Sequence, residues 1–342
     1  MSFDVTAIAP VFWDLRHGEP IPMQKPELPL AVCLGNFDGV HKGHTSLLRL
    51  TKELRDEKFP NALCGVFTFY IPSKDYLRPS LSGMSLEADS VGMGDSHLTT
   101  LEEKLSLFRE HGMDFACLCD FESICRLSPE SFLSFLSETI GVRGAVCGFN
   151  YRFGAKGQGT TALLSAYFDR PHDGFYVRIA DPVIVDGETV SSTYIRHLLK
   201  DGQADVAIRH LGRPYALESV VVKGKRLGRK LGFPTANQYF YTESLIPALG
   251  VYAVLCHTPM GIFPGVANIG SRPTVDQHAE VNCETHIFGP SQDLYGYRMR
   301  VEFLYRLRPE KQFASLEELT AAIAADAVAA RAYVQRYLAS RS

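Results

Sequence analysis

The sequence predicts an α/β domain with a parallel sheet, followed by an all-β domain with an antiparallel barrel and a C-terminal helix. From residue 30 to about 200, apolar strand-like runs alternate with helix-like segments, which favours a parallel sheet covered by helices on both faces. From about 215, strand-like runs are separated by turn residues alone, which favours an antiparallel barrel or sandwich. The length of 342 residues fits two domains.

Five prolines between positions 10 and 29 predict an irregular lead-in over residues 1–29. The α/β domain is expected over 30–200, with buried strands at 30–34, 62–69, 115–119, 144–147 and 175–179. One helix between them has clear start signals, because Ser128 can cap it and Pro129 suits the first helical position. A linker is expected over 201–214, which contains a Gly and a Gly-Arg-Pro sequence.

The barrel domain is expected over 215–342. Its strand-like runs are 217–223, 251–256, 262–267, 281–288 and 299–304. The final helix begins with a capping box of Ser315 and Glu318, and an apolar stripe follows from Leu316 to Leu338.

The composition describes an ordinary soluble globular protein, with 46% hydrophobic residues, 21% charged residues and a net charge of −3. This balance of charges offers no basic surface for nucleic acid. No run reaches the eighteen apolar residues that a membrane span would need, and the first residues do not resemble a secretory signal. Eight cysteines without a C-x-x-C pair favour buried thiols in a reducing cytoplasm over zinc or disulfides. The sequence leaves the oligomeric state open and is compatible with a homo-oligomer.

The segment 35–44, G-N-F-D-G-V-H-K-G-H, follows a buried strand and leads into a helix. A helix start offers unpaired N–H groups and a positive dipole end, which suit a phosphate. His41 and His44 are three residues apart, so both would lie on one face of the first turn and could stabilise charge at phosphorus. The alternative is a pair of surface or capping histidines. The spelling H-x-G-H resembles the nucleotidyltransferase superfamily.

The segment 224–237 has a glycine at every fourth position up to Gly232, with basic residues between them. Such a loop can wrap a polyphosphate with backbone N–H groups, and it is not a Walker A loop. Thr235 and Asn237 add hard oxygen ligands suited to Mg²⁺. The alternative is a glycine-rich hairpin with solvated charges.

Longer motifs carry a family resemblance. The string G-R-x-L-G-F-P-T-A-N at 228–237 resembles the riboflavin kinase family, and further family motifs follow at 250–252, 265–275, 284–288, 293–296 and 308–310. The first half resembles the partner module through 35–44, 148–154 and 191–196. The chain is identified as a member of the bacterial bifunctional riboflavin kinase/FAD synthetase family over about residues 30–338. The resemblance implies a Rossmann-like nucleotidyltransferase domain before the kinase barrel, with riboflavin, FMN and ATP as small-molecule substrates.

For the kinase, the resemblance implies transfer of the ATP γ-phosphoryl to riboflavin, with Glu284 as the base and Thr235 and Asn237 as Mg²⁺ and phosphate ligands. The ligand-binding residues expected on the same ground are Gly224, Lys225, Arg229, Gly232, Phe233, Pro234 and Arg308.

For FAD synthesis, it implies that the FMN phosphate attacks a second ATP without a general base, and that His41 and His44 contact the ATP phosphates. Arg196 would act with Ser191, Ser192 and Thr193 on the departing pyrophosphate, although these three could instead serve only as a helix cap. Asn150 matches a family position near the nucleotide. The remaining nucleotide-binding residues expected here are Gly35, Asn36, Phe37, Asp38 and Gly43.

One departure from the family bears on activity, because Tyr70-Ile71-Pro72-Ser73 replaces the usual aromatic-Pro-His-Pro. Two alternatives to the bifunctional enzyme follow. One is a riboflavin kinase with a vestigial first module, and the other is a non-catalytic flavin-binding regulator. Retention of the two histidines together with Glu284 and the metal-ligand residues argues against the regulator.

Overall fold

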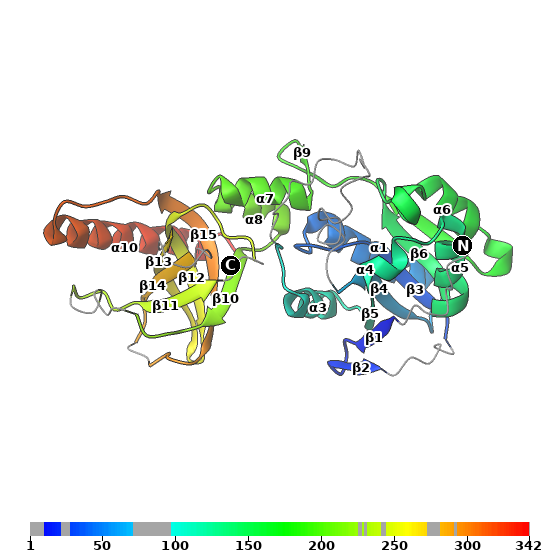
Figure 1. Cartoon of the computed structure of the whole chain (residues 1–342), viewed down its shortest axis with the longest axis horizontal. Coiled ribbons are helices and arrows are strands. Elements are labelled where there is room, and N and C mark those ends of the chain that lie inside the picture. The colour runs from blue at the N-terminus through cyan, green and yellow to red at the C-terminus, as the bar shows by residue number, and fades with distance from the viewer. Residues whose placement is uncertain are drawn as a thin grey trace. The chain divides into compact units, whose positions relative to one another are not determined.

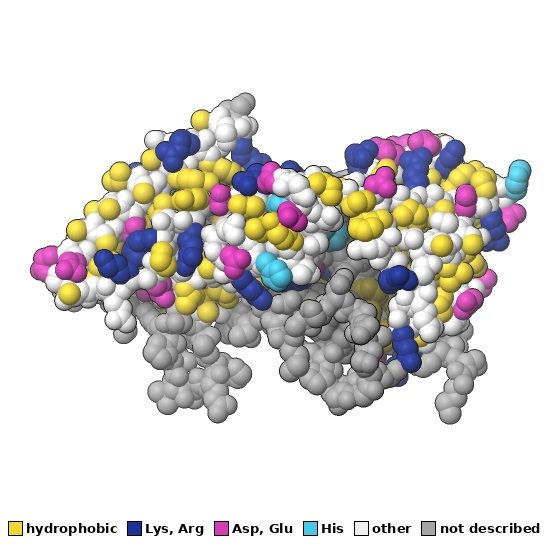
Figure 2. Space-filling view, turned by 90° about the horizontal axis from the view of Figure 1, so that it is seen from above, with side chains coloured by type: hydrophobic (Ala, Val, Ile, Leu, Met, Phe, Trp, Pro, Cys, Tyr) yellow, Lys and Arg dark blue, Asp and Glu magenta, His cyan; other side chains and the backbone are white. Residues whose placement is uncertain are grey.

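The structure is a computed structural model that describes residues 10–21, 28–70, 97–224, 228, 231–240, 244–271, 281–290 and 293–341. The chain divides into two compact units, coloured along the chain in Figure 1. The N-terminal unit ends at Val190, and the C-terminal unit takes the chain from Ser191 onward together with His97 and Leu98. Figure 2 shows acidic and basic side chains interspersed over the face drawn, as a net charge of −3 suggests.

The N-terminal unit is built on a sheet of seven described strands in the order β2-β1-β5-β4-β3-β6-β7. The neighbouring strands β5, β4, β3, β6 and β7 run parallel to one another. β1 runs antiparallel to β5, and β2 runs antiparallel to β1. The strands are β1 (Val11–Asp14), β2 (Glu19–Ile21), β3 (Leu30–Leu34), β4 (Leu63–Phe69), β5 (Phe115–Cys119), β6 (Val142–Gly148) and β7 (Tyr176–Ala180). The prediction of a parallel α/β domain is confirmed.

Helices pack on both faces of this sheet, as alternate residues of β3 show. Leu30, Val32 and Leu34 join one buried cluster, which contains residues of α5 and α6. Cys33 joins the other cluster, which contains residues of α1 and α3. The helices are α1 (Lys42–Lys58), α3 (Leu101–Glu110), α4 (Phe121–Ile124), α5 (Pro129–Ser134) and α6 (Thr161–Phe168), and short turns of helix are η3 (Phe135–Ile140), η4 (Ala155–Gly157) and η5 (Pro171–Asp173). A separate small hairpin pairs β8 (Ile184–Val185) with β9 (Glu188–Thr189).

The stretch expected as an irregular lead-in instead contains β1 and β2, which extend the sheet beyond β5. Phe12 of β1 is buried against Phe115, with ring centroids 5.8 Å apart. Pro20 lies in β2, the edge strand, where a residue without an N–H donor is tolerated. The number of prolines predicted an irregular segment. The prediction was wrong for this part because an edge strand can contain proline.

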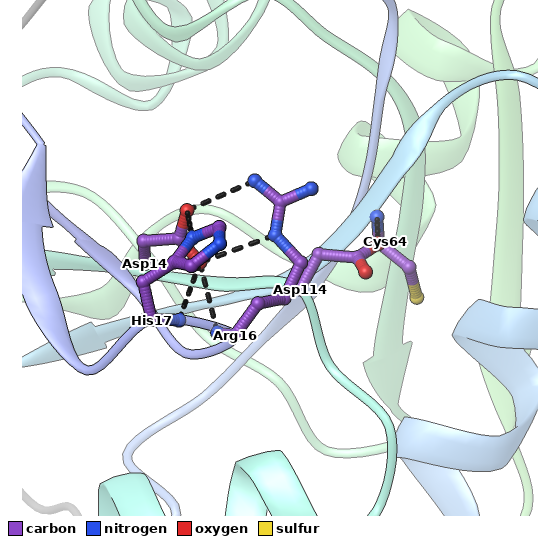
Figure 3. Close-up of polar contacts among 5 residues, drawn as sticks. All are labelled: Asp14, Arg16, His17, Cys64 and Asp114. Atoms are coloured by element: carbon purple, nitrogen blue, oxygen red, sulfur yellow. Dashed lines mark hydrogen bonds and ion pairs between the residues drawn. The ribbon is translucent and has the colours of Figure 1, made fainter.

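A charged turn closes the β1–β2 hairpin (Figure 3). The Asp14 carboxylate accepts hydrogen bonds from Arg16 Nε at 3.1 Å and Nη2 at 2.9 Å, and His17 Nδ1 lies 3.0 Å from Asp14 Oδ2. The Arg16 guanidinium holds the pKa of Asp14 well below its ordinary value, and this effect exceeds the opposing effect of burial. The same turn is joined to the start of β5, where Leu15 N donates to Asp114 O at 3.0 Å.

The C-terminal unit is an antiparallel sheet of six described strands in the order β10-β15-β12-β13-β14-β11. Its two outer strands approach each other, since Ser219 Oγ of β10 donates to Tyr239 O of β11 and Gln238 Nε2 of β11 donates to Ser219 O, both at 2.8 Å. The sheet is thus a nearly closed barrel, which confirms the second half of the predicted fold. The strands are β10 (Tyr215–Val220), β11 (Ala236–Phe240), β12 (Gly250–Thr258), β13 (Gly261–Ser271), β14 (Val281–Ile287) and β15 (Arg298–Arg308).

Among the described residues of this unit, the helices are α7 (Ser192–Lys200), α8 (Ala204–Leu211) and α10 (Leu316–Ala339). The stretch predicted as a linker contains α8. Gly212, which suggested a linker, instead ends this helix in a left-handed conformation with φ 86°. Ser315 caps α10 as predicted, with Glu318 N donating to Ser315 Oγ at 3.2 Å, while the Glu318 carboxylate accepts from Ala314 N at 3.2 Å and not from Ser315 N as in a complete capping box. Only the middle of its apolar stripe is buried, while Leu316 and Leu338 are exposed.

Candidate active sites

The loop before α1 lies at the carboxyl end of β3, between the neighbouring strands β4 and β6. The strand order reverses here, because β4 and β5 follow on one side of β3 and β6 and β7 on the other. Ligands of open α/β sheets bind at the carboxyl ends of the strands at such a reversal. The segment 35–44 therefore occupies the position where this fold binds nucleotides.

His41 and His44 lie together at the first turn of α1. His41 is the N-cap, and its Nδ1 accepts a hydrogen bond from His44 N at 3.3 Å. The two rings stack with centroids 3.7 Å apart and planes 12° apart. A methyl group at Gly43 would lie 3.1 Å from the His41 ring, so this glycine leaves the space that the imidazole needs. His41 is thus both a capping residue and a neighbour of His44.

The loop is held by a set of hydrogen bonds that includes residues outside the predicted motif. Asn36 O accepts from Lys104 Nζ at 3.0 Å and from Thr68 Oγ1 at 3.2 Å. Asp38 Oδ1 accepts from Thr99 N at 3.4 Å, and Thr99 Oγ1 accepts from Gly39 N at 3.0 Å. Motif reasoning missed Lys104, although a lysine between apolar residues on the buried face of a helix is a readable signal.

Asn150 follows β6, which is the parallel neighbour of β3 on the other side of the reversal. Its side chain is exposed, and a turn fixes its backbone position, with Tyr151 N donating to Gly148 O at 3.1 Å. The carboxyl ends of β3 and β6 are adjacent, so Asn150 and the histidine loop lie at the same edge of the sheet.

The segment 191–196 forms the start of α7 in the C-terminal unit. Ser191 is the N-cap, with Oγ accepting from Tyr194 N at 3.2 Å, and Arg196 is buried. The predicted cap is therefore present. Val190, the last residue of the N-terminal unit, lies near the histidine loop, because its carbonyl oxygen is 3.7 Å from where a methyl group at Gly43 would be. Ser192 and Thr193 are in the first turn of α7.

In the barrel, Asn237 and Glu284 are direct cross-strand partners of β11 and β14. Their side chains therefore lie on the same face of the sheet. Glu284 Oε1 accepts from Asn282 Nδ2 at 2.9 Å. His286 Nδ1 lies 2.8 Å from Pro234 O, which ties the P-T-A-N segment to the strand that carries Glu284. Two motifs that are about fifty residues apart in the sequence thus meet on one face of the barrel.

The donor set at Asn237 fits a hard cation. Asn237 Nδ2 donates to Thr235 O and Thr235 Oγ1, each at 3.4 Å, while its Oδ1 is buried and has no hydrogen-bond partner among the described residues. The amide and hydroxyl oxygens of Asn237 and Thr235 are ligand types that Mg²⁺ accepts. The described parts of the chain contain no group of three or more His, Cys, Asp or Glu side chains that could hold a metal.

The glycines of this segment pack closely against the residues that follow it. A side-chain carbon at Gly224 would lie 2.5 Å from Asn237 Oδ1, and one at Gly228 would lie 2.3 Å from Phe233 O. Phe233 N donates to Gly228 O at 2.8 Å, and Gly232 adopts a left-handed conformation with φ 85°. The predicted ligand-binding residues Lys225 and Arg229 lie outside the described residues.

Arg308, also expected to bind a ligand, is engaged with the last helix. Its guanidinium donates from Nε and Nη2 to the Asp326 carboxylate, with the Nη2 bond at 2.8 Å. This pair joins the end of β15 to α10.

Comparison with known proteins separates the two units by family. A FAD synthetase family model matches residues 23–194, and a riboflavin kinase family model matches residues 211–334. The chain is 34% identical to the bifunctional riboflavin kinase/FMN adenylyltransferase of Escherichia coli K12, over 91% of this chain and 94% of the relative. It belongs to that family.

The chain is also similar to a second relative of the same name and to a solved structure. The namesake from Bacillus subtilis is 30% identical, over 86% of this chain and 89% of its own. A crystal structure described as that of a macrolide-efflux protein from Streptococcus pneumoniae superposes with a TM-score of 0.77 at 29% identity, covering 92% of this chain and 95% of that one. Within the part of the chain that the structure describes, no helix is long and apolar enough to cross a membrane.

The chain is accordingly a riboflavin kinase and an FMN adenylyltransferase, and it produces FMN and FAD with ATP. The bifunctional prediction is confirmed over the kinase-only and regulator alternatives. The variant positions Ile71, Pro72 and Ser73, which raised the kinase-only alternative, lie outside the described residues.

Proposed function

We propose that riboflavin phosphorylation takes place on the barrel face shared by Asn237 and Glu284. The Glu284 carboxylate takes the proton from the 5′-hydroxyl of riboflavin as that oxygen bonds to the γ-phosphorus of ATP and the bond to ADP breaks. Gly224, Gly228 and Gly232 keep the backbone beside this face free of side chains, which suits the approach of phosphates. The observation that carries this proposal is the cross-strand pairing of Asn237 with Glu284 beside Gly224.

Mg²⁺ is part of this proposal, with Thr235 and Asn237 as its protein ligands. When bound, the ion would neutralise charge on the phosphate oxygens. The buried and unpartnered Oδ1 of Asn237 among the described residues supports this role, since a buried acceptor left unsatisfied is costly.

FMN adenylylation takes place, in this proposal, at the histidine loop of the N-terminal unit. A phosphate oxygen of FMN bonds to the α-phosphorus of ATP, and the bond to pyrophosphate breaks. Because FMN phosphate is already anionic, the site needs alignment and positive charge rather than a base. His41 and His44 contact the ATP phosphates, and Asn150 lies at the nucleotide. The role of Ser191, Ser192, Thr193 and Arg196 on the pyrophosphate rests on the family motif alone. The stacked histidines at the switch point of the sheet carry this part of the proposal.

Two substitutions in the full-length protein test the assignment. Glu284→Gln should abolish FMN formation from riboflavin while FAD still forms from added FMN, because only the base of the kinase is lost. His41→Ala should abolish FAD formation from FMN while FMN still forms from riboflavin. The products are separated by chromatography after incubation with ATP and Mg²⁺. Retention of riboflavin phosphorylation by Glu284→Gln would remove Glu284 as the base, and loss of both activities in His41→Ala would contradict the division of labour.

We also propose that the enzyme is cytoplasmic. All eight cysteines are free thiols, seven of them buried, as in proteins of a reducing compartment. Burial raises the pKa of Cys283 to about 12, which keeps this thiol protonated and unreactive at neutral pH.

A further inference from the structure

Lys104 is a buried cation behind the histidine loop. It lies on the packed face of α3, is 2% exposed, and donates from Nζ to the carbonyl oxygen of Asn36 at 3.0 Å. Lysine is rarely buried to this degree, because its ammonium loses hydration that groups of the protein must replace. The position therefore calls for a reason beyond packing.

The loop that Lys104 contacts has an unfavourable backbone. Phe37 and Val40 adopt left-handed conformations, with φ of 55° and 38°. A β-branched residue in this region is a clear outlier, and such strain persists only where the surroundings enforce it. His41 follows directly after Val40, so the strained backbone sets the position of the first histidine.

The enforcing contacts come largely from one short segment, residues 99–104. Thr99 bonds to both Asp38 and Gly39, and Lys104 bonds to Asn36. The oxygen and hydrogen of a trans peptide point in opposite directions, so holding the Asn36 carbonyl towards α3 directs the N–H of Phe37 to the other side of the peptide plane. Lys104 thus controls the orientation of a peptide group within the phosphate-binding motif.

We propose that Lys104 is a positioning residue for adenylyl transfer. It holds the Asn36 peptide so that the strained loop presents His41 and His44 at the start of α1. This inference rests on the proposed role of the histidine loop in FMN adenylylation. Lys104 acts through the backbone and touches neither ATP nor FMN.

The test is the near-isosteric, uncharged variant Lys104→Met in the full-length enzyme, assayed for both reactions at a temperature where circular dichroism shows it folded. We expect kcat for FAD formation to fall about tenfold or more, since small misplacements of catalytic groups cost up to ~10²-fold. The kinase rate of the same protein should stay unchanged. A purely structural lysine would lower the melting temperature yet leave kcat of the folded protein at the wild-type value, and that result would overturn the proposal.

Lys52→Met is the matched control. Lys52 lies in the same unit and also donates to a backbone carbonyl, His111 O at 3.4 Å, which lies outside the 35–44 loop. It should retain wild-type kcat for FAD formation. An equal loss in both lysine variants would show a general effect of removing a lysine and would count against Lys104.

Thr68→Val decides the matter if Lys104→Met does not fold. It removes the second donor to Asn36 O, at 3.2 Å, and replaces a buried threonine with a residue of the same shape. A reduced kcat for FAD formation supports the proposal that the hydrogen bonds to Asn36 O position the loop. An unchanged kcat overturns that proposal. His41→Ala is assayed in parallel: if it loses FAD formation while the Lys104 and Thr68 variants keep it, the site stands and the positioning role fails. If His41→Ala keeps it, the site assignment itself fails.

Discussion

At the scale of single residues, both sites depend on small groups that make room for functional ones. Gly43 leaves the space for the His41 ring, and Gly224 leaves the space for the Asn237 side chain. The spacing of His41 and His44 predicted that they share one face of the first turn, and their rings stack there. The bond from Lys104 to Asn36 could not be predicted, because the two residues are 68 positions apart and meet only through packing of α3.

The Asp14 turn yields a residue-scale prediction for acid stability. Because the folded-state pKa of Asp14 lies below its ordinary value near 4, the ionised carboxylate stabilises the fold at neutral pH, and this contribution is lost as the pH falls from about 5 towards the folded-state pKa. Asp14→Asn should therefore lower the unfolding free energy by about 2 kcal/mol at neutral pH and by progressively less in acid.

The measurement is denaturant unfolding followed by tryptophan fluorescence, because the single tryptophan, Trp13, precedes Asp14 in β1. Glu138→Gln, at an exposed position of the same unit, is the control and should show no such pH-dependent difference. A destabilisation by Asp14→Asn that stays constant down to acid pH would contradict the role of the charge.

At the scale of elements, the strands of the C-terminal sheet were predictable, but the approach of its two outer strands that nearly closes the barrel was not. The alternation of strand-like runs and turns from 215 onward predicted the barrel strands. The contact between β10 and β11 includes the side chain of Gln238, a buried polar residue that no periodicity distinguishes from a surface one. In the same way, Gly202 and Gly212 suggested a linker, although each follows the end of a packed helix.

Gln238 provides the element-scale prediction. Its Nε2 donates to Ser219 O at 2.8 Å and to Met299 O at 2.6 Å, so Gln238→Met leaves two carbonyls of the barrel without this donor. The barrel should lose about 2–3 kcal/mol of stability. After graded heating, riboflavin phosphorylation should disappear at a lower temperature than in the wild type, while FAD formation from FMN keeps its wild-type profile. Parallel loss of both activities would show that the two units unfold together.

At the scale of the whole molecule, each unit contains a complete hydrophobic core, and the family models divide along the chain in the same way. Glu284→Gln and His41→Ala proteins should therefore complement each other when mixed. The His41 variant makes FMN from riboflavin, and the Glu284 variant converts that FMN to FAD. FAD should appear from riboflavin in the mixture and in neither protein alone. Absence of FAD from the mixture would mean that FMN is not released between the reactions.

The sequence alone determined the two fold classes, the family and both activities, because these depend on short-range patterns: hydrophobic period, glycine spacing and motif spelling. The tertiary structure decided which distant residues meet. Pairing of β11 with β14 brought Asn237 to Glu284, and packing of α3 brought Lys104 to the histidine loop. Such contacts arise when buried surfaces and backbone hydrogen bonds are satisfied over the whole chain at once, and no local pattern in the sequence encodes that balance.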